Sequence, residues 1–391
     1  MLSFKRAASV EADRKPVVCY YTNWSQYRPG DAKFISSDID VSLCDDLIFA
    51  FAALSGSRPC TLIPVEWNDD GPNGMYEQFT SLKILKPSLR TLLSVGGWSM
   101  GTETMTLMLS TAETRAEFVT SSIEYLRSRN FDGLDLHFEY PGNHGSPPED
   151  KQRFTSLVQE LRAAYDEESR RTKQTPLLIT AAVSAVRTII TSAYEIEEIC
   201  SELDSIGLMS YDFEGGWGSS TGHNAQLYAR SAQESYNAEL NVEWAADYWV
   251  SQGCPKSKLL IGMPMYGRGF TLRDPDQNGF GAPAGGPSPS MEYTREAGFL
   301  SYYEICTLSN VNRVFDEESK VPYVYDESVW IGYDDDESLR NKVEWVHEEG
   351  LMGVMVWAMD LDDFSGSFCD QGPYPLISFS AGSLETVVSE S

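Results

Sequence analysis

Residues 132–141 have the clearest chemical content in the chain, because three ionisable side chains occupy alternate positions there. Side chains of a β-strand point alternately to its two faces, so Asp135, His137 and Glu139 share one face. Burying three such groups is costly unless they are paired, so a purely structural role explains them poorly. We interpret the segment as a buried strand that carries acid–base or ligand-binding groups.

Eight short apolar segments predict the strands that must position these groups. Most are continuous apolar runs, which is typical of strands covered on both faces. They are residues 17–24, 47–54, 91–98, 133–140, 177–185, 206–212, 259–266 and 353–360. Stretches with helical periodicity lie between them, including residues 114–129, 150–165 and 336–349.

Strand–helix units repeated in this way predict an α/β protein with a (β/α)8 (TIM) barrel. A doubly wound sheet is the alternative, but no glycine-rich phosphate loop follows the first strand. The carboxyl ends of barrel strands open onto the active-site mouth, which places Glu139 nearest to solvent.

The connection between the seventh and eighth strands is rich in Gly, Pro and aromatic residues and too long for an ordinary loop. It predicts a small α+β insertion. The expected organisation is an N-terminal extension at 1–15, a barrel at 16–267 and 333–377, the insertion at 268–332 and a frayed tail at 378–391.

The composition excludes several classes of protein. Acidic residues number 58 against 30 basic ones, a net charge of −28, so nucleic acids and anionic membranes would be repelled. No apolar run approaches the roughly 18 residues of a membrane span. We expect a globular monomer without nucleic-acid or membrane partners.

The cysteines and the N-terminus leave the compartment open. Seven cysteines without a CxxC spacing argue against a structural zinc site and a dense disulfide scaffold. Residues 1–15 are polar and charged and lack the apolar core of a secretory signal.

The segment DGLDLHFEYP at 132–141 resembles the DxxDxDxE signature of family 18 glycoside hydrolases, the chitinases and chitinase-like lectins. Other strands of that family are similar to LLSVGGW (92–98), LMSYDF (208–213), GMPMYGR (262–268) and VWAMD (356–360). Its animal members are also similar at YTNWSQYR (21–28), EWND (66–69) and TREAG (294–298). The resemblance covers residues 16–377.

Family 18 enzymes use the N-acetyl oxygen of the substrate as the nucleophile, so one carboxyl acts as both acid and base. The resemblance implies that this group is Glu139, preceded in the catalytic motif by Asp135 and His137. Tyr211 and Asp212 match residues that hold the N-acetyl group.

The resemblance also implies a substrate-binding surface. Trp357 matches the indole floor under the distorted sugar, and Trp24, Trp98 and Trp217 extend this platform, since pyranose rings expose apolar C–H faces. The remaining implied contacts are Tyr27, Phe51, Gly97, Tyr140, Met209, Tyr266, Arg268 and Glu296. Five other tryptophans are assigned to core packing or left unassigned: Trp67, Trp244, Trp249, Trp330 and Trp345.

The family pattern further implies disulfides between Cys19 and Cys44 and between Cys306 and Cys369. It leaves Cys60, Cys200 and Cys254 without family partners. Such disulfides imply an oxidising compartment, so we expect an extracellular, secreted protein whose N-terminus here is incomplete or alternative.

The sequence departs from the family at His137, where active members carry an aspartate, and at Phe138, where tryptophan is usual. That aspartate helps to keep the catalytic acid protonated and accepts the acetamido N–H as positive charge develops. A neutral imidazole supplies no negative charge there, and a protonated one favours ionised Glu139. Losing one such electrostatic partner typically costs about 10²–10³ in rate.

We therefore predict a protein that binds chitin or chito-oligosaccharides and hydrolyses them weakly or not at all. A working chitinase is the alternative, supported by the retention of Glu139, Asp135, Tyr211 and Asp212. A third hypothesis is that the cleft is blocked and that the protein acts only through its outer surface. A metal site at His137 is disfavoured, because no second histidine lies within motif range and the family uses no metal. No cofactor is expected.

Overall fold

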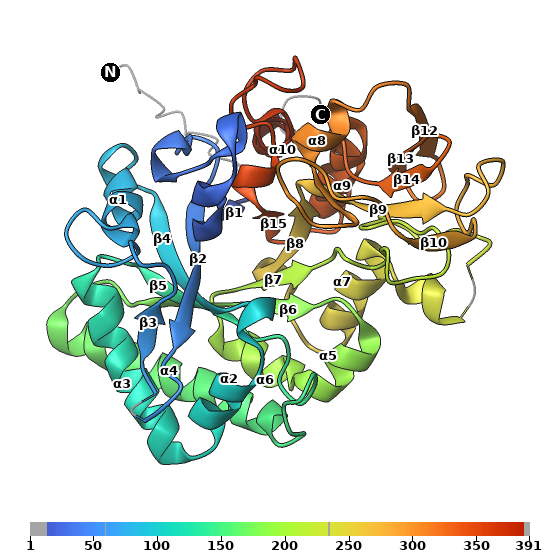
Figure 1. The fold of residues 1–391 in the computed structure, drawn as a ribbon. Coiled ribbons are helices and arrows are strands. Elements are labelled where there is room, and N and C mark those ends of the chain that lie inside the picture. The colour runs from blue at the N-terminus through green and yellow to red at the C-terminus, as the bar shows by residue number, and fades with distance from the viewer. Residues whose placement is uncertain (1–13, 59, 234, 387–391) are drawn as a thin grey trace, which may run out of the picture.

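The computed structural model describes residues 14–58, 60–233 and 235–386, and the first thirteen residues of the expected N-terminal extension lie outside this part. A closed barrel of eight parallel strands forms its centre (Figure 1). The barrel strands are β1 (Val17–Thr22), β2 (Asp46–Leu54), β4 (Arg90–Gly96), β5 (Gly133–His137), β6 (Leu178–Ser184), β7 (Ser205–Met209), β8 (Leu259–Pro264) and β15 (Gly353–Trp357). Pairing of β1 with both β2 and β15 closes the barrel, which confirms the predicted fold class.

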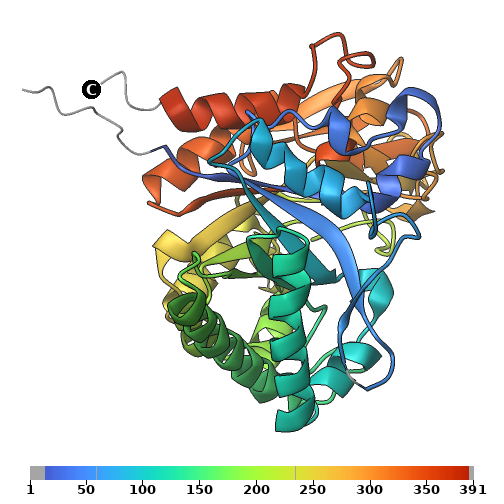
Figure 2. The same ribbon diagram turned by 90° about the vertical axis from the view of Figure 1, so that its left-hand side faces the viewer.

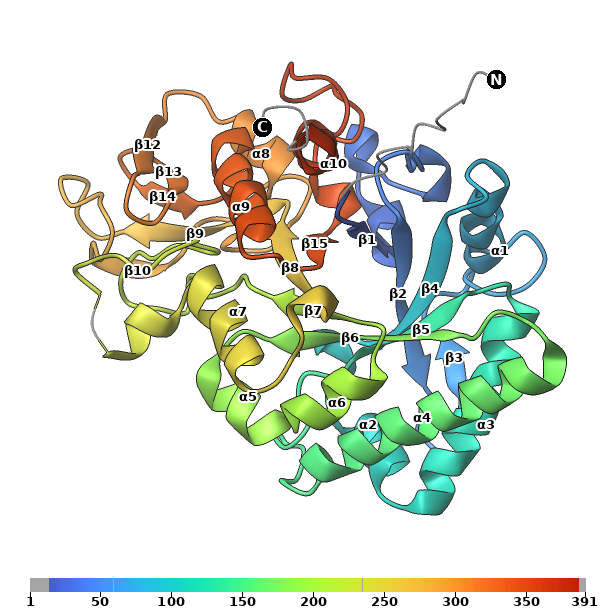
Figure 3. The same ribbon diagram turned by 180° about the vertical axis from the view of Figure 1, so that it is seen from behind.

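Helices cover the outside of the barrel, because their apolar faces pack onto strands that are buried on both sides. They are α1 (Met75–Thr80), α2 (Glu103–Leu109), α3 (Ala112–Ser128), α4 (Asp150–Thr172), α5 (Arg187–Ala193), α6 (Ile196–Glu202), α7 (Val242–Ser251) and α9 (Asp336–Glu348). The long helices α3 and α4 lie side by side on one flank (Figure 2). The view from behind shows the same pair below β5 (Figure 3).

A second, antiparallel sheet stands beside the barrel between β8 and β15, where the sequence predicts an insertion. Its strands are β9 (Tyr266–Leu272), β10 (Ala284–Pro287), β11 (Phe299–Ser301), β12 (Asn312–Asp316), β13 (Val321–Tyr325) and β14 (Val329–Gly332), with the short helix α8 (Tyr302–Cys306). The sheet has its own buried cluster, which includes Phe270, Tyr323 and Trp330. Since β9 begins at Tyr266, this sheet continues directly from the end of β8 and forms one side of the barrel mouth.

The C-terminal segment differs from the expected frayed tail, because residues 375–386 form helix α10 (Pro375–Thr386). Leu376, Ile377 and Leu384 are buried, and the helix packs against α9. The buried carboxylate of Asp362 accepts the backbone N–H groups of Leu376 (3.1 Å) and Ile377 (2.9 Å), which satisfies the first turn. The rest of the predicted tail, 387–391, lies outside the described residues.

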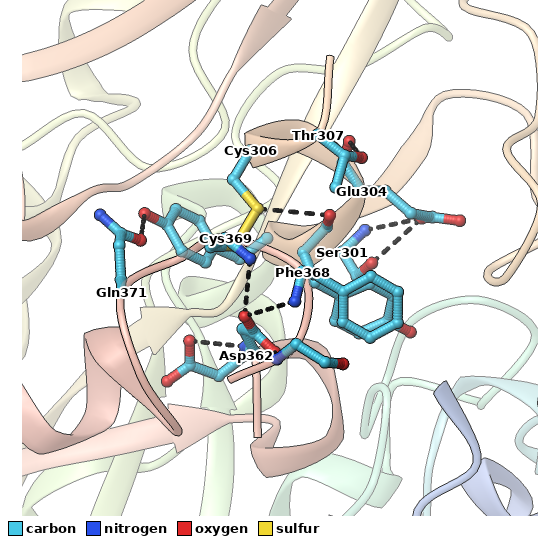
Figure 4. The surroundings of a disulfide bond; sticks show 12 residues. Ser301, Glu304, Cys306, Thr307, Asp362, Phe368, Cys369 and Gln371 are labelled. Carbon is cyan, nitrogen blue, oxygen red and sulfur yellow. Dashed lines mark hydrogen bonds between the residues drawn. A yellow bond between two sulfur atoms is a disulfide. The ribbon is translucent and has the colours of Figure 1, made fainter. Parts of the chain in front are cut away.

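Both expected disulfides are present, Cys19–Cys44 and Cys306–Cys369. Figure 4 shows how the second one joins the end of α8 to the loop after β15, next to Ser301, whose N–H and hydroxyl bond to Glu304. A third disulfide, Cys200–Cys254, links the end of α6 to the loop before β8, so two cysteines without family partners pair with each other.

Cys60 is buried and free. None of the helices in the described part of the chain combines the length and apolar character needed to span a membrane.

Candidate functional site

A cleft of about 1550 Å³ lies at the carboxyl ends of the barrel strands and is bordered by the antiparallel sheet. Its wall includes the last residues of five barrel strands, which are Thr22, Gly96, His137, Met209 and Trp357. The predicted residues that line it are Trp24, Tyr27, Phe51, Trp98, His137, Glu139, Tyr140, Met209, Tyr211, Asp212, Trp217, Tyr266, Arg268, Glu296 and Trp357. Asp135 and Gly97 do not line it.

Asp135 lies beneath the cleft and is almost fully buried, with 1% of its surface exposed. Strand register places Ser94 and Thr180 beside it, and their hydroxyls donate to its carboxylate at 2.6 and 2.7 Å. The Tyr20 hydroxyl donates at 2.9 Å from across the barrel. Three neutral donors therefore compensate the burial of this carboxylate.

His137 and Glu139 form a separate pair at the end of β5. His137 Nε2 lies 3.2 Å from Glu139 Oε1, while the buried Nδ1 has no hydrogen-bond partner among the described residues. The imidazole is enclosed by the rings of Phe51 at 5.0 Å and Trp357 at 5.7 Å. Glu139 keeps 13% of its side chain exposed toward the cleft, so a ligand can reach it.

Tyr211 and Asp212 follow β7 and face the antiparallel sheet. Asp212 accepts hydrogen bonds from Tyr266 Oη (2.8 Å) and from Arg268 Nε and Nη2 (2.7 and 2.9 Å). Burial alone would lower the pKa of Arg268, but the charge and hydrogen bonds of Asp212 outweigh it and raise that pKa above its ordinary value. Burial, and then the charge of Asp212, also raise the pKa of Tyr211. We call Tyr211, Asp212, Tyr266 and Arg268 the clamp.

An aromatic floor also lines the cleft. Phe51 stacks against both Trp24 and Trp357, with ring centroids 5.8 and 5.9 Å away, and the two indoles also contact each other at 6.4 Å. Trp98 and Trp217 stand at the rim with 63% and 64% of their surfaces exposed. Flat, exposed rings of this kind suit the apolar faces of sugars, and the polar groups beside them suit the hydroxyls.

Gly97 acts on the cleft only through its packing. It has φ of +82°, and a Cβ atom there would lie 2.5 Å from the Phe51 ring. Its backbone N–H donates to the His137 carbonyl at 2.9 Å. Glycine at this position therefore allows Phe51 to occupy its place in the floor.

Several residues near the site lack a motif of their own in the sequence. Tyr20, Ser94 and Thr180 hold Asp135, and only the inward alternation of neighbouring barrel strands could have pointed to them. His144 lines the cleft, with its ring 5.0 Å from that of Trp98.

The other tryptophans divide between core and rim. Trp249, Trp330 and Trp345 are buried, in keeping with core packing. Trp67 is 85% exposed, so the core assignment is wrong for this residue.

No three His, Cys, Asp or Glu side chains in residues 14–58, 60–233 and 235–386 lie close enough together to hold a metal ion. His137 therefore has Glu139 beside it but no set of further ligands within the described structure.

Comparison with known proteins identifies relatives over nearly the whole chain. Chitotriosidase-1 from Mus musculus is 46% identical over 92% of this chain and 76% of that protein. Oviduct-specific glycoprotein from Mesocricetus auratus is 41% identical over 92% of this chain but only 52% of its own length, so the chain spans about half of that relative.

Solved structures also superpose on nearly the whole chain. A chitinase from Trichuris suis, described as immunomodulatory and active, superposes with a TM-score of 0.90 at 41% identity, over 95% of this chain and all of that one. Human YKL-39, described as a pseudo-chitinase with retained chitooligosaccharide binding, has a TM-score of 0.90 at 37% identity, over 95% of this chain and 99% of that one. The model for glycosyl hydrolases family 18 matches residues 16–362. The chain therefore belongs to glycosyl hydrolase family 18.

Proposed function

We propose that this protein binds chitin or chito-oligosaccharides in the barrel cleft and hydrolyses them weakly or not at all. The observation that carries the proposal is the 3.2 Å contact between His137 Nε2 and Glu139 Oε1, at the position where active members carry a second carboxylate. The open cleft, with its aromatic floor and clamp, supports binding and argues against a blocked site.

With a neutral imidazole, the His137–Glu139 contact has two possible hydrogen-bond directions, and both oppose proton transfer to a glycosidic oxygen. If Nε2–H donates to an ionised Glu139, the carboxylate holds no proton for the leaving group. If the Glu139 hydroxyl donates to Nε2, its proton is committed to the imidazole. In both forms Nδ1 remains without a partner, and the imidazole at position 137 supplies no negative charge to the developing cation.

Asp135 does not replace the missing carboxylate. Its two oxygens are engaged by Tyr20, Ser94 and Thr180 beneath the cleft. A rate loss of about 10²–10³ relative to an aspartate at position 137 is the expected consequence. The relative YKL-39 is described as binding chitooligosaccharides as a pseudo-chitinase, which is the behaviour proposed here.

The second candidate function is a working chitinase. It is favoured by Glu139, which remains exposed to the cleft in the same site as Tyr211 and Asp212. In that case Glu139 is the acid/base and the N-acetyl oxygen of the sugar is the nucleophile. The relatives described as chitinase or chitotriosidase are compatible with this alternative.

We further propose an extracellular location for the protein. Three disulfides, each joining segments distant in the sequence, are typical of proteins that mature in an oxidising compartment.

The test combines calorimetric binding of chitotetraose with hydrolysis of a fluorogenic chitobioside by the wild-type protein and its Glu139→Gln variant. We expect saturable binding by both proteins and little or no turnover by the wild type. Turnover at rates of about 1 s⁻¹ or more, abolished by Glu139→Gln, would establish the chitinase instead. Absence of binding by both proteins would overturn both candidates.

A further inference from the structure

A second buried carboxylate, Asp69, lies beside the cleft and takes no part in the site described above. Its surface is 0% exposed. Its Oδ2 accepts the backbone N–H groups of Val65 (3.2 Å) and Glu66 (2.8 Å). The Asn23 amide Nδ2 donates to both carboxylate oxygens, at 2.9 Å to Oδ2 and 3.2 Å to Oδ1. Asp69 therefore ties residues 65–69, which we call the rim loop, to the 3-10 helix η1 (Asn23–Tyr27).

The rim loop and η1 together form one end of the cleft. Asn23, Tyr27, Val65 and Glu66 all line it. The Tyr27 hydroxyl donates to Glu66 Oε2 at 2.7 Å across the same junction.

The exposed indole of Trp67 is carried by the rim loop. The side chains of Gln26 and Asn68 also bond to each other across this junction. The bonds between Asp69 and Asn23 are the buried part of the contacts that position this aromatic surface.

Trp67 does not line the cleft itself, but it directly follows Val65 and Glu66, which do. Only an oligosaccharide long enough to pass these two residues reaches the indole, whereas a short one bound at Glu139 and Trp357 does not need it.

The pair of Asn23 and Asp69 is unbalanced while the carboxyl is ionised. Asn23 Nδ2 faces two acceptors, whereas Asn23 Oδ1 is buried without a hydrogen-bond partner among the described residues. A protonated Asp69 carries the one donor that this oxygen lacks. A small rotation of the amide would let Nδ2–H donate to one carboxyl oxygen while the new O–H donates to Oδ1.

The electrostatic surroundings favour this protonated form. Burial raises the pKa of Asp69 from 3.8 to about 6, although the hydrogen bonds from Glu66, Asn23 and Val65 lower it. The ionisable groups that couple to Asp69 are Glu66 on its own loop and the phenols Tyr21 of β1, Tyr27 of η1, Tyr76 of α1 and Tyr125 of α3. All of these groups are acids, so none of them favours the carboxylate.

The sign of the pH effect follows from comparing the docked rim loop of the structure with an undocked loop in which Asp69 is exposed to solvent. With the rim loop docked, Asp69 binds its proton up to about pH 6, whereas a solvated Asp69 releases it near 3.8. Raising the pH from 4 to 7 therefore favours the undocked loop. A difference of about two pKa units corresponds to a factor of at most about 100 in the docking equilibrium.

We propose that Asn23 and Asp69 are positioning residues that make the grip of this cleft on long chito-oligosaccharides pH-dependent, tighter in mild acid than at neutral pH. The proposal rests on the proposed function, because it needs chito-oligosaccharides to bind in the cleft. It assigns Asp69 a role beyond the fold, since its proton occupancy changes the bonds to Asn23 that join the rim loop to η1.

The experiment compares the affinities for chitotriose and chitohexaose at pH 5.0 and 7.5. The ratio of the two affinities is the readout, since any effect of pH at the end of β5 acts on both ligands. We expect the advantage of the hexamer over the trimer to fall by about tenfold between pH 5.0 and 7.5. In Asp69→Asn the side chain stays neutral, so the advantage should become independent of pH.

The matched control is Asp70→Asn, which removes the neighbouring exposed carboxylate that pairs with Arg129. It should keep the pH dependence of the wild type. A hexamer advantage that is the same at both pH values, or one that keeps its pH dependence in Asp69→Asn, would overturn the inference. If neither ligand binds at either pH, the proposed function itself is wrong.

A second measurement covers the case in which Asp69→Asn does not fold. Carbon-13 NMR of the side-chain carboxyl follows the titration of Asp69 directly in the wild-type protein. We expect a midpoint near 6 that rises when chitohexaose binds and does not move with chitotriose. A midpoint near 4, or one that is insensitive to the hexamer, would contradict the inference.

Discussion

The clamp and the end of β5 are two halves of one cleft, and they differ in how completely their polar groups are satisfied. In the clamp, Asp212 accepts three hydrogen bonds from Tyr266 and Arg268, and its N–H donates to Asn224. At the end of β5, His137 makes one contact with Glu139 and leaves Nδ1 unpaired. The difference indicates that the residues suited to holding a sugar are intact, while those suited to moving a proton are altered.

Breaking the clamp should have the largest effect on stability. Asp212→Ala leaves the guanidinium of Arg268, only 14% exposed, with Glu296 at 3.7 Å as its remaining acidic partner. We expect the free energy of unfolding to fall by roughly 2–3 kcal/mol, below the range for a fully buried pair because Asp212 is partly exposed. Denaturant titration measures this change. A loss below about 1 kcal/mol would mean that the clamp is no better bonded than the end of β5.

Removing the aromatic floor should have the next largest effect, on binding rather than on folding. Trp357→Ala deletes the indole that stacks on Phe51. We expect affinity for chitotetraose to fall by about 30-fold, equivalent to about 2 kcal/mol, by analogy with buried tryptophan contacts in other interfaces. Calorimetry checks the loss, with Trp244→Phe on the outer helix α7 as the control. Unchanged affinity in Trp357→Ala would place the ligand elsewhere.

Weakening the support of Asp135 should have a smaller effect. Tyr20→Phe removes one of three donors and leaves Ser94 and Thr180 in place. We expect a loss of about 1.5–2 kcal/mol in unfolding free energy, the lower part of the range for one hydrogen bond to a charged group, because two donors remain. Thermal or denaturant unfolding reports it. A loss above 3 kcal/mol would show that the remaining two donors cannot hold the carboxylate.

Replacing the imidazole should have the smallest effect on stability. His137→Phe removes an unpaired buried nitrogen and places an apolar ring among Tyr20, Phe51 and Trp357. Glu139 remains partly exposed and can be solvated, so we expect a change within about 0.5 kcal/mol. Denaturant unfolding beside Asp212→Ala makes the comparison direct. A loss as large as that of Asp212→Ala would contradict the contrast between the two regions.

The sequence predicts the barrel well, because most of its strands are continuous apolar runs that stand out from polar helical stretches. It predicts α10 poorly, since Ser and Gly dilute the pattern of buried Leu376, Ile377 and Leu384. The Cys200–Cys254 disulfide depends on the approach of the α6 end to the loop before β8, which spacing alone does not reveal.

The candidate site is predictable to the extent that its residues lie in motifs. Fifteen of the seventeen predicted catalytic and substrate-binding residues line one cleft, and Asp135 and Gly97 lie just outside its wall. The contacts that hold the buried carboxylates were not predictable, because they join segments distant in the sequence. Asp135 is held by Tyr20 of β1 and Thr180 of β6, and Asp69 meets Asn23 only through the fold.

The most direct test of the account restores a carboxylate at position 137. Hydrolysis and binding of chitotetraose are measured between pH 4 and 8 for the wild type, His137→Asp, Glu139→Gln and the double variant. We predict that His137→Asp hydrolyses chitotetraose about 10²–10³-fold faster than the wild type. Both variants that carry Glu139→Gln should show no hydrolysis. All four proteins should bind chitotetraose with similar affinity. Wild-type turnover equal to or faster than that of His137→Asp would contradict it.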